Sequence, residues 1–361
     1  MNPSLPLTFE PDSPYRRLAH ALDELPNRYP PAGDGSDLRL LARLFTPDQA
    51  DLAASLAPEL ETPAQIFRRL ARNSHETMSL LKEMSQKGLI ATGKTTQGRL
   101  GFGLLPFVVG IYENQNERID IELAQLFEDY YLHAFGAALE IKPQVHRVIP
   151  VGESIPNTME VQPFESVSGL IDQAQAWGVS DCICRKQKAL IGQACEHPLD
   201  VCMILGDTPD AFAGSSTIRP LSREGAYQTL RRAAQAGLVH CVSNNQHNVW
   251  YICNCCTCSC GILRGMVDLG IANVVARSPF VNQVNEDLCT GCGECLDACQ
   301  FNALSIDGVA LVQEVRCAGC GVCIQFCEQG ALRLERRSGE TVPPVSEEDW
   351  RSARRETLRA A

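Results

Sequence analysis

The feature that most constrains this chain is a cysteine spacing that occurs twice near its C-terminus. The segments DLCTGCGECLDACQFNALSI and VRCAGCGVCIQFCEQGALRL both contain the pattern C-x2-C-x2-C-x3-C. Three cysteines in this spacing allow one short loop to hold three corners of an iron–sulfur cubane. The fourth cysteine cannot reach that cubane and is placed to bind a second one. The repeat therefore predicts two [4Fe–4S] clusters and one-electron transfer.

This arrangement resembles the bacterial-type ferredoxins that carry two [4Fe–4S] clusters. The resemblance covers residues 281–336 and implies a two-cluster ferredoxin fold. Two zinc knuckles are the alternative, but they need four ligands in two pairs, whereas each repeat here offers three plus one. The ligands that the resemblance implies are Cys289, Cys292, Cys295 and Cys327 for the first cluster, and Cys317, Cys320, Cys323 and Cys299 for the second.

Residues around these cysteines agree with the family at most positions and depart from it at two. The proline that usually follows each fourth cysteine is replaced by Gln300 and Glu328. We expect looser turns there, and we expect the charge of Glu328 to favour the oxidised cluster. Glycines that should approach the clusters with positive φ are Gly291, Gly293, Gly319 and Gly321. Apolar residues expected in two short hairpins are Leu304, Ile306, Leu311, Leu332 and Leu334.

Ten more cysteines lie in the middle of the chain and are candidate metal ligands. By sequence they form a set of four, Cys182, Cys184, Cys195 and Cys202, a set of five, Cys253, Cys255, Cys256, Cys258 and Cys260, and the separate Cys241. Three interpretations stay open: one or two further [4Fe–4S] clusters, structural zinc, or buried small side chains. His197 could replace a thiolate at a zinc site, although a surface position before Pro198 is favoured.

Alternation along the second set bears on how the ligands divide. In an extended conformation, Cys256, Cys258 and Cys260 face one side, while Cys253 and Cys255 face the other. One face could then complete a site begun by the first set. The CxCR and CNCC patterns ahead of a two-cluster unit resemble a broad group of bacterial iron–sulfur proteins over most of the chain. That resemblance implies electron transfer and indicates no substrate.

The N-terminal third is predicted to be helical. Thr46 with Gln49, and Thr62 with Gln65, form capping boxes with a proline at the first helical position. A third helix starts at Asn73 and is followed by an expected hairpin with a polar turn. Three short helices and a hairpin resemble the winged helix-turn-helix family over residues 38–105. Residues 62–100 hold seven basic residues against two acidic ones, which would suit phosphate contacts.

Length and composition favour a multidomain α+β protein. The chain has 361 residues and a net charge of −11. Residues 281–335 hold eight acidic residues against two basic ones, a surface suited to docking a basic redox partner. The predicted domains are an extended arm at 1–35, a winged-helix-like helical module at 36–150, a cysteine-rich metal-binding domain at 151–280, a two-cluster ferredoxin domain at 281–336 and a charged tail at 337–361.

The N-terminus lacks the apolar stretch of a signal peptide, and no run of about 18 apolar residues is present. Dense cysteine without a secretory signal indicates metal binding in a reducing cytoplasm, with oxygen-sensitive clusters.

Function is predicted as electron transfer to or from a larger redox partner. No nucleotide-binding glycine motif or nucleophile elbow is present, so an electron-transfer protein or subunit is favoured over a self-contained enzyme. Two alternatives stay open. One is a redox-sensing transcription regulator that uses the winged helix to bind DNA. The other is an oxidoreductase with its active centre in the middle domain.

Overall fold

The computed structural model describes residues 9–156, 158–339 and 342–360, which form two compact units. The first unit contains the described residues up to Ala138, together with Leu190–Gly192, and the second contains the rest. The boundary between the two units therefore lies at Leu139, whereas the sequence predicted a domain boundary at residue 150. The difference arises because strand β3 (His146–Ile149) pairs with a strand of the second unit.

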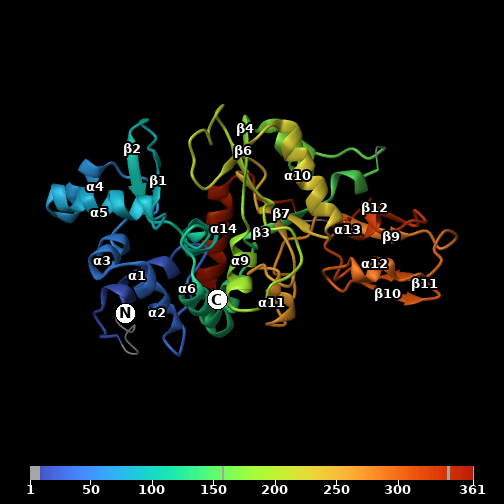
Figure 1. Cartoon of the computed structure of the whole chain (residues 1–361), viewed down its shortest axis with the longest axis horizontal. Helices are drawn as coiled ribbons and strands as arrows, with labels where there is room; N and C mark the ends of the chain where they lie inside the picture. The colour runs from blue at the N-terminus through green and yellow to red at the C-terminus, as the bar shows by residue number, and fades with distance from the viewer. Residues whose placement is uncertain (1–8, 157, 340–341, 361) are drawn as a thin grey trace. The chain divides into compact units, whose positions relative to one another are not determined.

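The first unit is mainly helical (Figure 1). Its α-helices are α1 (Pro14–Asp23), α2 (Ser36–Leu44), α3 (Pro47–Ala54), α4 (Pro63–Leu70), α5 (Ser74–Gln86), α6 (Ile121–Tyr130) and α7 (Gly136–Leu139), the last reaching the boundary. Its other elements are β1 (Ala91–Lys94), β2 (Leu100–Gly103), η1 (Phe107–Ile111), η2 (Glu113–Gln115) and η3 (Tyr131–Phe135). The expected N-caps at Thr46 and Asn73 and the capping boxes are confirmed, as is the hairpin, in which β1 pairs with β2.

The expected extended arm is wrong over Pro14–Asp23, which form a helix. Helix α1 lies inside it, because Ser13 caps the helix, Pro14 occupies its first position and Leu18 and Leu22 are buried one turn apart. Residues 1–8 of that expected arm lie outside the described residues. Residues 113–139 form η2, α6, η3 and α7 in succession, with Asp120 capping α6.

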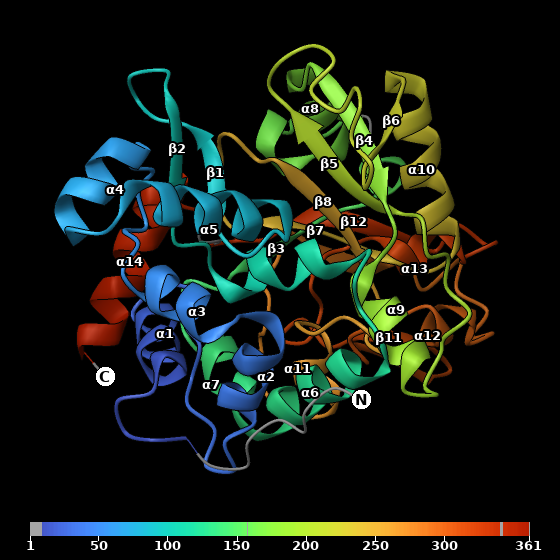
Figure 2. The same cartoon turned by 60° about the vertical axis from the view of Figure 1, so that its left-hand side comes forward.

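The second unit is built on an antiparallel six-stranded sheet with the order β3-β7-β8-β5-β4-β6. Its strands after β3 are β4 (Ala176–Ser180), β5 (Cys202–Gly206), β6 (Arg219–Leu221), β7 (Val239–Ser243) and β8 (Tyr251–Cys255). Its helices in this region are η4 (Gly152–Ser154), η5 (Pro163–Glu165), α8 (Val167–Gln173), α9 (Ile183–Leu190, with its last residue in the first unit), α10 (Arg223–Gln235) and α11 (Arg264–Val267). Figure 2 shows α10 beside β4 and β6.

The two faces of this sheet carry different side chains. On one face, Met203 of β5 and Ile252 of β8 pack in an apolar core with Leu170 of α8 and Leu230 of α10. Side chains alternate along a strand, so Cys202 and the cysteines of β8 project from the opposite face. The sheet therefore stabilises itself through one face and presents thiols on the other.

The C-terminal elements of the second unit form the ferredoxin part. They are β9 (Phe280–Val284), α12 (Glu294–Asp297), β10 (Leu304–Asp307), β11 (Val309–Val312), α13 (Val322–Gln325) and β12 (Leu332–Arg336). Strands β10 and β11 form one expected hairpin. The second expected hairpin is wrong, because β12 pairs with β9, which precedes the first cysteine loop. Long-range pairing of this kind closes the two repeats into one body.

The expected charged tail contains a helix that is packed against the unit. Helix α14 (Glu347–Ala360) buries Trp350, whose indole Nε1 donates to the carbonyl of Gln144 at 2.9 Å. Arg354 is fully buried and donates to the carbonyls of Ile141 and Pro143, both at 2.7 Å. No helix among the described residues is long and apolar enough to cross a membrane.

Candidate metal centres

The first ferredoxin loop gathers three cysteines with one from the second repeat. Burial raises the pKa of the Cys295 thiol, and the charges of Cys327, Cys292 and Cys289 raise it further. These four cysteines line one small cavity with apolar neighbours that include Ile306. The fourth ligand expected from the other repeat thus lies at the first loop.

The second loop shows the reciprocal arrangement. Burial raises the pKa of Cys320 to about 12, and the charges of Cys299 and Cys317 act in the same direction. Burial likewise raises the pKa of Cys323, and the charges of Cys320, Cys299 and Cys317 raise it further. The structure therefore brings together the two sets of four thiols implied by the sequence. Thiols buried this close together would be costly as free thiolates, and binding to iron removes that cost.

N–H groups donate to several cysteine sulfurs in this region. The backbone N–H of Ala310 lies 3.3 Å from Cys289 Sγ, and that of Ala303 lies 3.3 Å from Cys299 Sγ. The side-chain Nδ2 of Asn282 lies 3.4 Å from Cys323 Sγ, and Asn282 is buried on β9. Donors to the sulfurs stabilise negative charge on a bound cluster and raise its potential.

The expected glycine conformations are confirmed, since all four glycines between ligands have positive φ. At Gly319 (φ +69°) a Cβ atom would lie 2.0 Å from the carbonyl oxygen of Phe280. At Gly291 (φ +68°) it would lie 2.3 Å from the carbonyl oxygen of Gly308. A side chain at either position would displace backbone that supports a ligand loop.

The two loops differ in what covers them. Cys292 of the first loop is exposed, and the acidic residues nearby, Glu286, Asp287, Glu294 and Asp297, are exposed as well. The second loop is held by segments outside the ferredoxin part. Val151 donates its backbone N–H to the carbonyl of Cys320 at 2.9 Å, and Ser154 Oγ donates to that of Gly321 at 2.7 Å.

Comparison with known proteins agrees with this geometry. The profile of the family described as "4Fe-4S binding domain" matches residues 282–305. These residues carry a 4Fe–4S binding domain. A curated relative, "Probable ferredoxin" from Methanosarcina thermophila, is 54% identical over 37 residues, which is 10% of this chain and 64% of the relative. The chain thus matches less than two thirds of that ferredoxin's length, and the match bears on the 4Fe–4S domain alone.

In the middle domain, the structure divides the cysteines differently from their order in the sequence. Seven of them form what we call the seven-cysteine group. Six of the thiols form a closed ring in which each contacts the next, and the seventh contacts one member of the ring. In ring order these are Cys184, Cys182, Cys202, Cys253, Cys255 and Cys260, with Cys241 in contact with Cys255. Cys241 is therefore part of a group, whereas the sequence left it separate.

His146 adjoins this group and was not singled out in the sequence. Its ring lies within 4.8 Å of the thiols of Cys241 and Cys255. It is buried, and neither ring nitrogen has a hydrogen-bond partner among the described residues. Burial lowers the pKa of His146 to about 4, so the imidazole is neutral at pH 7. A neutral buried imidazole beside thiols has the chemistry of a metal ligand.

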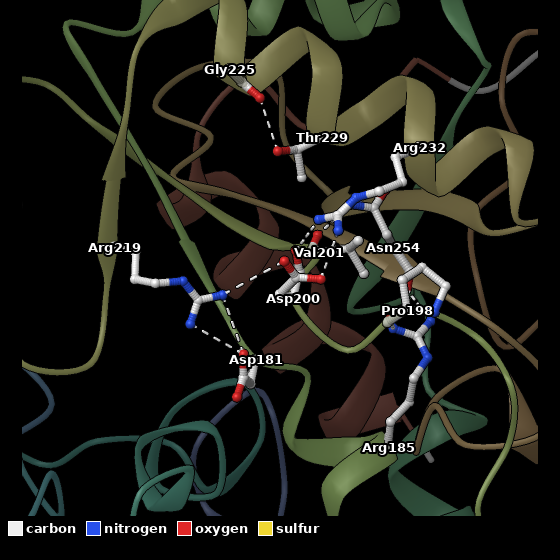
Figure 3. A network of polar contacts seen from close by, with 10 residues as sticks. All are labelled: Asp181, Arg185, Pro198, Asp200, Val201, Arg219, Gly225, Thr229, Arg232 and Asn254. Carbon is white, nitrogen blue, oxygen red and sulfur yellow. Dashed lines mark hydrogen bonds and ion pairs between the residues drawn. The ribbon is translucent and has the colours of Figure 1, made fainter.

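A buried cation faces the same group. Arg185, from the CxCR motif, is 4% exposed and donates to the carbonyls of Asn254 (2.7 Å) and Pro198 (3.0 Å), as Figure 3 shows. The described residues include no carboxylate paired with it, and its Nε has no partner. Burial would lower the pKa of Arg185, but the charges of the surrounding cysteines, led by Cys182 and Cys256, raise it. Metal-bound thiolates of these cysteines would supply the negative charge that this guanidinium needs.

The remaining cysteines gather around His197 in what we call the Cys3His cluster. Its members, Cys195, His197, Cys256 and Cys258, place their ligand atoms within 4.8 Å of one another. Burial raises the pKa of Cys256, but the His197 hydrogen bond and the Arg185 charge lower it to about 6. His197 is half-buried, so the surface position favoured from sequence does not describe it.

Gln300 connects this cluster to the second ferredoxin loop. Its Oε1 accepts from the backbone N–H (3.0 Å) and the hydroxyl (2.8 Å) of Thr257, which lies between two cluster cysteines. Its Nε2 donates to the carbonyl of Gly237 at 3.1 Å. The side chain that replaces the usual proline therefore anchors the exit from Cys299, where the sequence suggested a looser turn.

Proposed function

We propose that this chain is an iron–sulfur electron-transfer protein that binds two [4Fe–4S] clusters and exchanges electrons with a larger redox partner. The observation that supports it is the crossed arrangement of the ferredoxin thiols. Cys327 lies with the first loop and Cys299 with the second. Each set then offers four thiolates, which is what a [4Fe–4S] cluster requires.

A bound [4Fe–4S] cluster accepts and releases one electron at a time. The chain supplies the surroundings that set the potential. The backbone amides of Ala303 and Ala310 and the side chain of Asn282 donate to ligand sulfurs. Apolar side chains such as Ile306 and Leu332 line the first site. We place the protein in a reducing cytoplasm, where cysteines stay reduced and can bind metal.

The exposed first loop is the proposed docking site. Its ligand Cys292 is exposed among acidic side chains, and an acidic surface attracts a basic partner and speeds association. The second loop is covered by Val151 and Ser154. We therefore propose that electrons are exchanged with the partner at the first cluster and with the interior of the chain at the second.

The test of the main proposal is metal analysis of anaerobically purified protein with EPR of the reduced sample. We expect about eight iron and eight sulfide per chain from the ferredoxin part. Cys327→Ser should abolish the signal of the first cluster and leave that of the second. Fewer than about eight iron per chain, or loss of the second cluster in Cys327→Ser, would contradict the ligand sets.

Docking is tested with reduced methyl viologen, a cationic electron donor. The rate of electron delivery should fall as ionic strength rises, because salt screens the attraction to the acidic side chains near Cys292. We call these side chains, Glu286, Asp287, Glu294 and Asp297, the acidic rim. Glu294→Lys with Asp297→Lys should lower the rate at low salt. The matched control is Glu347→Lys with Glu348→Lys, the same charge change on α14. Equal effects of both pairs would show that net charge, and not the rim, governs the rate.

A second candidate is a further redox centre in the middle domain. One observation that favours it is the burial of Arg185 without a paired carboxylate among the described residues. Another is that the nitrogens of His146, beside Cys241 and Cys255 of the seven-cysteine group, have no hydrogen-bond partner among those residues. The group offers enough ligands for one or two additional iron–sulfur clusters. About twelve or sixteen iron per chain, with additional EPR features, would support this candidate, and eight would exclude it.

DNA binding is less well supported. Three of the seven basic residues in the winged-helix-like segment are paired with acidic residues, Arg69 with Glu61, Arg72 with Asp51 and Lys87 with Glu83. These pairs reduce the charge that phosphates would meet. We expect the protein to show no salt-sensitive retention on DNA. Charge reversal of Lys82 and Lys94 should therefore leave its behaviour on DNA unchanged. Retention that disappears in that variant would favour the regulator.

A further inference from the structure

We infer that the Cys3His cluster binds a single zinc ion, separate from any iron–sulfur centre. Its four ligand atoms come from two segments, one containing Cys195 and His197 and the other containing Cys256 and Cys258, and all lie within 4.8 Å of one another. Three thiolates and one imidazole form a closed structural zinc site. The inference does not depend on the proposed electron-transfer function.

The spacing of these atoms matches a tetrahedral ion. Bonds of about 2.3 Å to sulfur and about 2.05 Å to nitrogen place a sulfur and a nitrogen ligand about 3.6 Å apart, and two sulfurs about 3.8 Å apart. The distance from Cys258 Sγ to His197 Nδ1 is 3.6 Å. This pair is therefore already at the separation that one zinc ion would impose, and the other ligand atoms lie within 4.8 Å.

The ferredoxin thiols give an internal comparison. Among the described residues, two sets of three or more potential ligands approach within 4.8 Å, and neither contains a ferredoxin cysteine. A cubane holds its ligands at four separate irons, so its cysteines must be spread more widely than those around one ion. The Cys3His cluster is too compact for a cubane and has the size of a mononuclear site.

Other groups near the cluster are consistent with a closed site. Ser259 Oγ lies 3.3 Å from Cys195 Sγ, which suits a hydroxyl donating to a metal-bound thiolate. Cys256 is buried while Cys258 is exposed, so the ion would join the interior to the surface turn. Thr257 lies between them and binds Gln300. Zinc would thereby fix the turn to which the second ferredoxin loop is anchored.

The test is zinc analysis and zinc-edge X-ray absorption on the full-length protein purified anaerobically with its iron. We expect about one zinc per chain, with three sulfur ligands at about 2.3 Å and one nitrogen at about 2.05 Å. His197→Ala and Cys258→Ser should each reduce zinc content at least fivefold while iron content is unchanged. The matched control is His247→Ala, an exposed histidine of the same unit, which should keep its zinc.

The outcomes separate this inference from the proposed function. Absence of zinc from protein that carries its full iron would overturn the inference and leave the electron-transfer proposal intact. A four-sulfur zinc shell, or zinc retained by both His197→Ala and Cys258→Ser, would overturn it too. Zinc present without iron would instead support this site and contradict the two-cluster proposal. If one variant fails to fold, the absorption spectrum of the unmodified protein still decides the ligand set.

Discussion

Replacing Asn282 by leucine should lower the reduction potential of the second cluster without affecting the first. Asn282 donates from Nδ2 to Cys323 Sγ at 3.4 Å, whereas its Oδ1 is buried and has no partner among the described residues. Leucine has a similar branched shape but no donor. The substitution therefore removes one hydrogen bond to sulfur and also an unsatisfied carbonyl, so the fold should tolerate it.

The size of the shift follows from the strength of that bond. A hydrogen bond contributes about 1 kcal/mol net, and more when its acceptor carries greater charge. Reduction adds one negative charge to the cluster, so we assign about 1 kcal/mol of extra stabilisation to the reduced form. A tenfold change in equilibrium, about 1.4 kcal/mol, corresponds to about 59 mV for one electron. The expected fall is therefore about 40 mV.

The assay is an EPR-monitored potentiometric titration that resolves the two clusters. Gln283→Leu is the matched control, because it makes the same polar-to-apolar change at the next residue of β9, whose side chain points to the other face. The control should shift neither cluster by more than about 10 mV. A fall in both potentials, or equal shifts in Asn282→Leu and Gln283→Leu, would refute the argument that one N–H···S bond tunes one cluster.

Three further predictions concern the supports of the metal centres. Gln300→Ala should destabilise the second unit by about 2 kcal/mol in urea unfolding, because it removes three hydrogen bonds, whereas Glu328→Ala at the exposed equivalent position should have little effect. Arg185→Met should reduce metal bound by the middle domain, measured by elemental analysis, while Arg219→Met, an exposed arginine paired with acids in Figure 3, should not. Gly319→Ala should cost more than about 2 kcal/mol and release iron from the second cluster, because its Cβ would meet a backbone carbonyl.

Local sequence patterns predicted the ferredoxin part well for a physical reason. Three of the four ligands of each set lie within one short loop, so their spacing alone describes the loop. Glycine positions such as Gly319 are equally local, since a positive φ is a property of one residue. The pairing of β9 with β12 was missed because it joins segments that flank both repeats.

The middle domain was harder to predict because its ligands come together through the sheet. Cys255 and Cys256 are adjacent in sequence but belong to different groups, since β8 ends at Cys255 and successive side chains face opposite ways. His146 lies in strand β3, between two prolines, and no sequence motif marks it as a ligand. The only sequence signal for His197 as a ligand is its spacing of two residues from Cys195. That spacing identifies a metal site only when the structure shows that Cys256 and Cys258 lie beside it.

The burial of Arg185 has a consequence for how the protein is made. A newly synthesised chain without metal would have to enclose this guanidinium among neutral thiols, and burying a charge without compensation costs several kcal/mol. We therefore expect the middle domain to stay open until it binds metal, with its cysteines accessible to solvent until then. Metal binding and closure of the domain then become one step, so metal-free protein should be cleaved by proteases more readily than metal-loaded protein.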